Sequence, residues 1–188
     1  MFSHDTEQSL QAVVDLVNSD PDLGGPEGLP DVETLRVFVA THRISGAEDL
    51  SSRDLQAVRK TRRGFAAFFG LEDVETAAAL ANALLAKASM RPRLSNHDDY
   101  GWHMHYFAPG ASLAEHLIVE GGIALANVVA EGELDRLRVC ENPTCRSVLV
   151  DLSRNRSKRY CDASTCGNRL HVAAYRERKR NQLQAMQG

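Results

Sequence analysis

Targeting segments and long hydrophobic runs are missing from this sequence. The N-terminus reads Met-Phe-Ser-His-Asp-Thr-Glu-Gln and lacks the basic region and apolar run of a signal peptide. No apolar stretch approaches the roughly 18 residues that a membrane span requires. The stretch from Ile118 to Ala130 is broken by Glu120, two glycines and Asn127. We therefore expect a cytoplasmic protein with no membrane partner.

Motifs of common enzymes are missing as well. The chain has no nucleophile elbow, no phosphate-binding loop and no His-Glu-x-x-His element. Asp98 and Asp99 are adjacent carboxylates, but neighbours in a turn point apart and do not form a catalytic pair. We expect that the protein is not an enzyme.

Cysteine is absent from most of the chain, and its four copies lie between positions 140 and 166. They form two pairs, each with four residues between its members, and residues 146–160 separate the pairs. Two such knuckles can hold zinc in a tetrahedral site. Core cysteines would be scattered, and a reducing cytoplasm disfavours disulfides. The sequence thus predicts one structural zinc ion with the ligands Cys140, Cys145, Cys161 and Cys166.

The predicted zinc site is closed, because four thiolates leave no position for water or substrate. This is a further argument against an enzyme. A thiol redox switch that releases zinc on oxidation is an alternative, and it would require exposed thiolates of low pKa. His171, five residues after Cys166, is a weaker candidate ligand because four cysteines already complete the shell.

The second knuckle resembles a known family. Its sequence Cys166-Gly-Asn-Arg169, preceded by the basic stretch from Ser153 to Cys161, is similar to the CGNR-type zinc finger of bacterial transcription regulators. In that family the finger follows a mainly helical ABATE domain, which is described as part of a stress-induced regulator. Weaker similarity covers three N-terminal segments, namely Asp15-Leu-Val-Asn18, Arg91-Pro-Arg-Leu94 and Gly101-Trp102. The resemblance implies binding to double-stranded DNA and a small-molecule effector or partner site on the N-terminal domain.

Charge is distributed unevenly along the chain, although the net charge is only −3. Residues 136–188 carry 12 Lys/Arg against 4 Asp/Glu, or +8, whereas residues 1–135 carry 10 against 21, or −11. The C-terminal part is therefore expected to attract polyanions and the N-terminal part to repel them.

The candidate DNA-contacting residues lie on a basic loop and on one face of a predicted C-terminal helix. Such basic residues can neutralise DNA phosphates, and arginine can also contact guanine. They are Arg154, Arg156, Lys158, Arg159, Arg169, Arg176, Lys179 and Arg180. A solvated charged surface is the simpler interpretation, and Arg169 could instead cap a carbonyl of the knuckle.

A finger that binds RNA or an acidic protein is the alternative function. A homodimer is expected, because one small finger seldom supplies a long specific footprint.

Hydrophobic periodicity and capping residues predict a mainly α fold with a small β-hairpin. A helical regulatory or dimerisation domain is expected over residues 1–134, followed by a treble-clef-like zinc finger over 135–188. The predicted helices cover about residues 6–18 and begin again at the N-caps Asp31, Ser51, Asp73 and Ser112. The pair Gly121-Gly122 inside the last of them indicates either a bend or the close approach of another backbone.

Two hairpins are predicted. In the first, over residues 91–107, Trp102, Met104 and Tyr106 are expected to face the core, and a metal site formed by His97, His103 and His105 is a weak possibility. In the second, the strand of residues 148–152 is expected to return toward the second knuckle, with residues 154–158 near the tip. A helix is then expected over residues 164–184.

Overall fold

Side-chain caps fix where the long helices of the described residues begin. The computed structural model describes residues 2–45, 47, 49–96, 102–161, 163–168, 172 and 179. In this part of the chain the helices are α1 (His4–Asn18), α2 (Val32–Thr41), α3 (Ser52–Ala66), α4 (Val74–Leu85) and α5 (Leu113–Ala130). Their N-caps are Ser3, Asp31, Ser51, Asp73 and Ser112, and the last four confirm the predicted starts. Ser51 with Asp54 and Ser112 with Glu115 form complete capping boxes.

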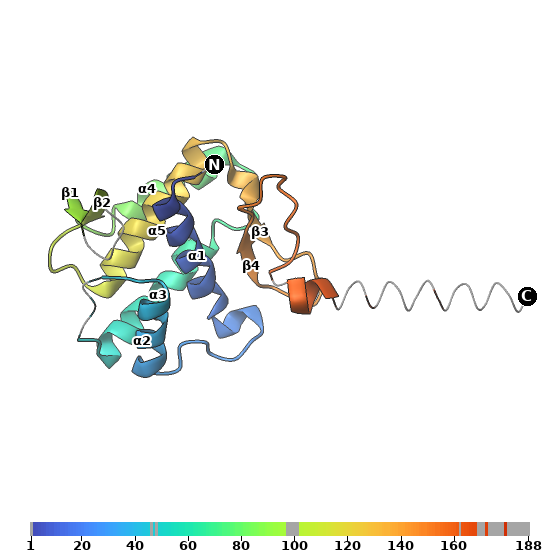
Figure 1. Cartoon of the computed structure of the whole chain (residues 1–188), viewed down its shortest axis with the longest axis horizontal. Helices are drawn as coiled ribbons and strands as arrows, with labels where there is room; N and C mark the ends of the chain where they lie inside the picture. Colours follow the sequence, from blue (N-terminus) through green and yellow to red (C-terminus); the bar gives the residue numbers. More distant parts are fainter. Residues whose placement is uncertain are drawn as a thin grey trace, which may run out of the picture.

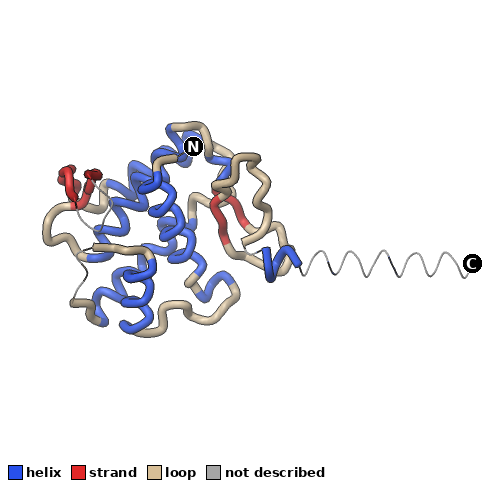
Figure 2. The backbone as a smooth tube through the Cα atoms, viewed as in Figure 1, coloured by secondary structure: helices blue, strands red, loops and turns tan. Residues whose placement is uncertain are grey.

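Two short antiparallel strand pairs complete the fold and lie on opposite sides of the helices (Figure 1). Strand β1 (Met90–Asn96) pairs with β2 (Trp102–Phe107), and β3 (Leu137–Val139) pairs with β4 (Val148–Val150). Short 3-10 turns cover Pro21–Leu23 and Leu134–Arg136. The coarser part of the predicted fold class, mainly α with a small β-hairpin, is confirmed for the described residues (Figure 2).

Helix α5 is the central element of the core and packs against α1, α3 and α4. Gly121 and Gly122 permit this packing, because a Cβ at Gly121 would lie 2.7 Å from Cγ2 of Val13 and one at Gly122 would lie 2.8 Å from Cδ2 of Leu85. The glycines therefore mark a close approach, made by neighbouring side chains and not by another backbone.

Helix α5 also corrects the expectation about apolar runs. Its 18 residues are long and apolar enough to cross a membrane by length and composition alone. Within the protein, 56% of that helix is buried, and the core helix of a folded domain passes the same test. Its hydropathy therefore follows from its place among α1, α3 and α4.

The first hairpin buries the face opposite to the predicted one. His105 and Phe107 are 8% exposed, whereas Trp102 is 71% and Met104 38% exposed. The prediction that Trp102, Met104 and Tyr106 form the hairpin core is wrong, because α5 packs against the other face and the ring of Phe107 stacks on His116. Residues 97–101, which include His97, Asp98 and Asp99, lie outside the described residues.

The second hairpin has a different partner from the predicted one. Strand β4 pairs with β3, which precedes the first knuckle, with Leu137 opposite Val150 and Val139 opposite Val148. All three residues of β4 are buried because the strand has apolar neighbours on both faces. Val148 and Val150 join the helical core, and Leu149 joins the cysteine cluster. A strand that is covered on both faces is apolar throughout, so the alternation of apolar and polar residues does not show which strand it pairs with.

Helix α1 is joined to β4 by one side chain. The amide of Asn18 donates to the carbonyl oxygen of Val148 at 2.9 Å and accepts from its N–H at 2.7 Å. Asn18 thus satisfies the edge of β4 as a neighbouring strand would. A π-helical turn, Ala163–Gly167, follows the second hairpin. Most of the helix predicted over residues 164–184 lies outside the described part of the chain, so the treble-clef-like topology stays a prediction.

Candidate metal centre and basic surface

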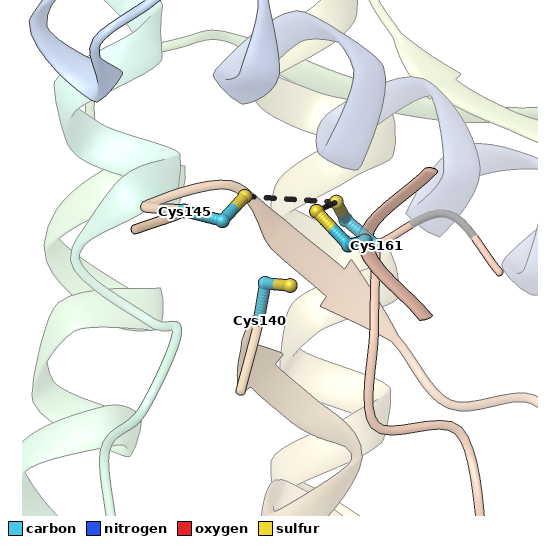
Figure 3. A group of neighbouring side chains, drawn as sticks. Cys140, Cys145 and Cys161 are labelled. Atoms are coloured by element: carbon cyan, nitrogen blue, oxygen red, sulfur yellow. Dashed lines mark hydrogen bonds between the residues drawn. The ribbon is translucent and has the colours of Figure 1, made fainter. Parts of the chain in front are cut away.

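Four cysteines from three local segments converge beside β4. Cys140 follows β3, Cys145 lies in the turn to β4, Cys161 follows the basic loop and Cys166 lies in the π-helical turn. Figure 3 shows the thiols of Cys140, Cys145 and Cys161 directed toward a common point. The first knuckle is shaped by its backbone, because the N–H of Cys140 donates to the carbonyl of Ser147 at 2.9 Å.

The distances between the sulfur atoms fit a tetrahedral zinc ion. The Sγ of Cys161 lies 3.7 Å from that of Cys145 and 3.7 Å from that of Cys166. Four sulfurs at about 2.3 Å from zinc are separated by about 3.8 Å in a tetrahedron. All four sulfurs lie within 4.8 Å of one another, and the cysteines are free thiols. The donor set and its spacing are those of a structural zinc site.

The thiols differ in how readily they ionise. Burial, reinforced by the neighbouring thiols, raises the pKa of Cys161 to about 12, and burial also raises the pKa of Cys140. Burial acts in the same direction on Cys145, but hydrogen bonds with Ser147 and with the thiols of Cys161 and Cys166 together outweigh it and lower the pKa to about 7. Because zinc binds thiolates, filling this cluster must release protons, and acid must oppose it.

The basic loop between the knuckles is built around the fully buried Asp151. Its carboxylate accepts from the N–H and the hydroxyl of Ser153 and from the N–H of Lys158 at 2.8 Å. Arg138 lies 3.3 Å from this carboxylate and donates to the carbonyls of Arg156 and Lys158. The sequence reading did not identify Asp151 and Arg138 as organising residues, because their contacts join the β3–β4 hairpin to the loop that follows it.

Two of the predicted DNA-contacting arginines are engaged in ion pairs. Arg156 adopts a left-handed backbone with φ of 50° and pairs with Glu133 at 2.7 Å and Asp135 at 3.2 Å. Arg159 donates from Nε to Glu141 at 2.6 Å. A left-handed conformation is costly for a residue other than glycine, so its contacts must hold it in place. Both arginines therefore help to fix the loop.

Other basic residues of this segment are turned to solvent. Arg154, Lys158 and Lys179 are exposed, and so is Arg146 in the first knuckle, which the sequence reading did not select. Nζ of Lys158 reaches the carbonyl of Val150 at 3.4 Å. The predicted residues Arg169, Arg176 and Arg180 lie outside the described residues, as does His171. The DNA-contacting role of the whole set stays a prediction.

A second group of metal-ligand side chains lies in the helical part of the chain. His105 on β2 meets His116 and Glu120 on α5, and one ligand atom of each lies within 4.8 Å of the others. The side chain of His103 is not among those described. The pair His116 and Glu120 stands four positions apart on one helix face, and this spacing was the signal that sequence reading missed.

Protein-family models match both parts of the chain. Residues 10–136 match the ABATE family, whose description reads "Putative stress-induced transcription regulator". The chain belongs to the ABATE family. Residues 136–179 match the CGNR zinc finger, so the arrangement that the resemblance implied is confirmed. The search of curated proteins finds no match.

The matched zinc finger contains all four clustered cysteines. Together they indicate zinc as the metal of this site. The expectation of a single ion stays a prediction.

Proposed function

We propose that this ABATE-family protein is a DNA-binding transcription regulator in which the zinc finger contacts double-stranded DNA. The observation that carries the proposal is the division of charge, +8 over residues 136–188 against −11 over residues 1–135. A duplex carries one negative charge per about 1.7 Å of helix axis, so only the finger segment has the sign to approach it. The zinc is structural in this proposal, and the protein acts in the cytoplasm without catalysing a reaction.

The arrangement of the basic loop supports this proposal. Asp151 and Arg138 hold the loop from inside, and the ion pairs of Arg156 and Arg159 fix its outer edge. This loop carries the exposed cations Arg154 and Lys158, and the exposed Arg146 directly follows the first knuckle. Preorganised side chains lose less conformational entropy on binding, which favours phosphate contacts at these three positions.

In this proposal the helical domain does not contact DNA and instead binds a small effector. Its negative charge repels DNA, and its cavity beside α1 and α5 is suited to a small effector. We further propose that the regulator acts as a homodimer, because a single small finger covers few base pairs.

A salt titration of binding to a duplex tests the proposal. Full-length, zinc-loaded protein is expected to bind at low salt, with log affinity falling against log salt by about 0.9 per phosphate neutralised. Arg146→Ala and Arg154→Ala are each expected to shallow the slope by about one unit and to weaken all sequences alike. Lys60→Ala, which removes an exposed cation on α3, is the matched control and should leave the slope unchanged.

Zinc content is measured for every variant, so that loss of the finger is not mistaken for loss of a contact. Absence of duplex binding at low salt would refute the proposal, as would equal slopes for wild type, Arg146→Ala and Arg154→Ala. Stronger binding to single-stranded RNA or to an acidic peptide under the same conditions would instead support an RNA-binding or protein-interaction module.

A further inference from the structure

A cavity of about 110 Å³ lies between α1, α5 and β2. His105, His116 and Glu120 line it together, along with polar side chains of α1 such as Gln8 and Ser9. A single water needs only about 10–15 Å³ of such space, so the cavity has room for an ion and a further small ligand.

The three side chains come from two elements that are packed against each other. His116 and Glu120 lie one helical turn apart on α5, and His105 belongs to the buried face of β2. Nδ1 of His105 is 3.5 Å from Oε1 of Glu120, and the same oxygen accepts from the N–H of Tyr106 at 3.3 Å. The strand thus positions the carboxylate beside the imidazole.

The orientation of His116 is also fixed from outside the group. Its ring stacks on Phe107 with centroids 3.7 Å apart. His116 is 8% exposed, so the residues packed around it limit its rotation.

The three ligand atoms are already close enough that binding an ion would require only a small movement of the side chains. All three ligand atoms lie within 4.8 Å of one another. Nitrogen and oxygen ligands at about 2.0–2.1 Å from a tetrahedral ion are separated by about 3.3 Å, so the widest pair has to close by about 1.5 Å at most. Rotation of the Glu120 side chain, which is 22% exposed, can supply such a movement.

Arg43 lines the same cavity, and a second cation, Arg93, is held at the ring of Phe107. Its Nη1 donates to the carbonyl of Phe107 at 3.1 Å, and its guanidinium lies 4.9 Å from the centre of the Phe107 ring. The charge of Arg93 still acts on His116, because burial first, and then the nearby His105 and Arg93, lower the pKa of His116 to about 4.

We propose that His105, His116 and Glu120 form a second metal site, which binds a divalent first-row transition-metal ion with an open coordination position facing the cavity. Two imidazoles and one carboxylate suit zinc, iron, nickel or copper and do not suit magnesium or calcium, which prefer oxygen ligands. Three protein ligands leave at least one position for water or a small donor molecule, unlike the closed cysteine site.

The test counts ions on the full-length chain, without DNA, so its outcome is independent of the DNA-binding proposal. Protein is first treated with a chelating resin until only the thiolate-bound zinc remains, and it is then titrated with zinc by calorimetry. Wild type is expected to bind one further ion per chain, and magnesium in excess is expected neither to bind there nor to compete. Glu120→Gln and His116→Gln are each expected to weaken this step by about 10-fold or more, on the scale of changes that disturb a metal site.

Two matched variants localise the ion. His42→Gln removes an imidazole that lines the same cavity but pairs with Asp15 at 3.2 Å, and Glu131→Gln removes an exposed carboxylate at the end of the same helix. Both are expected to keep the second ion. Circular dichroism of each metal-stripped variant checks that it is folded. A wild-type protein that binds no ion beyond the thiolate-bound zinc, or unchanged affinity in Glu120→Gln and His116→Gln, would overturn the proposal.

Discussion

The cysteine cluster and the histidine cavity are two groups of metal-ligand side chains that are assembled in different ways. The cysteines come from positions 140–166 and are shaped by hydrogen bonds within that segment. His105, His116 and Glu120 meet only because β2 packs on α5. The first group has four identical ligands and is closed, whereas the second has three ligands and lines a cavity. A closed site stabilises a fold, and an open one can exchange ligands.

The two regions share a boundary in β4. Leu149 packs against the cysteines, while Val148 and Val150 on either side of it pack in the helical core. Asn18 of α1 holds the same strand through both backbone groups of Val148. Strand β4 is therefore shared between the cysteine cluster and the helical core.

The largest expected effect comes from removing one zinc ligand. Cys145→Ser is expected to abolish zinc binding at the cysteine cluster and with it a stabilisation on the order of 10 kcal/mol, the scale of structural zinc in small fingers. Hydrogen exchange should then show residues 140–166 unprotected, while α3 and α5 keep their protection. Thr144→Ser, one position away, should retain zinc. Full protection of residues 140–166 in zinc-free Cys145→Ser would contradict a structural role for the metal.

A pair of leucine substitutions tests whether the two cores are separate. Leu137→Ala and Leu149→Ala remove side chains that are 2% and 1% exposed, and each is expected to lower the free energy of unfolding by about 2–5 kcal/mol. Leu149→Ala should also weaken zinc binding, because Leu149 packs on Cys140 and Cys166. Leu137→Ala should leave zinc affinity nearly unchanged. Equal loss of zinc affinity in the two variants would show that the hairpin and the cluster form one unit.

The smallest expected effect concerns the helical region and its dependence on pH. Glu27 pairs with Arg62, whose side chain is 3% exposed, and Glu27→Gln is expected to cost about 2–4 kcal/mol. The hydrogen bond from Arg62 holds the pKa of Glu27 below its ordinary value of 4.5. The ion pair therefore stabilises the fold fully above pH 4.5, and its contribution is lost as the pH falls through the lowered pKa.

Urea unfolding between pH 7 and pH 3 measures this dependence, with zinc release followed separately by a metal indicator. Asp22→Asn, which alters an exposed ion pair with Arg63, is the control and should cost about 1 kcal/mol or less. A wild-type stability that falls with acid no more steeply than that of Glu27→Gln would disprove the role of this pair.

Some features were predictable because they depend on residues close together in the chain. The capping residues at positions 31, 51, 73 and 112 fix helix starts through contacts three residues away. The cysteine spacing likewise indicates the zinc site, because each knuckle closes on itself. The family assignment followed from the Cys-Gly-Asn-Arg segment, which lies in one of these knuckles.

Two of the errors concern which face of a strand is buried and which strand it pairs with. The alternation from Trp102 to Phe107 predicts a strand, but it does not show which face of the strand packs on α5. In the structure Phe107 is on the buried face, where its ring stacks on His116, and Trp102 is exposed. Strand β4 is apolar throughout, so its pattern does not distinguish β3 from the segment before Cys161 as its partner.

The sequence by itself determined the helices, the cysteine site and the division of charge, since caps, short spacings and net charge depend on local order or composition. Only the tertiary structure decided that Arg156 and Arg159 fix the loop and that His105 joins His116 and Glu120. Such pairings link residues through packing between separate elements. Which residues meet in this way depends on how the surfaces of the whole core pack together.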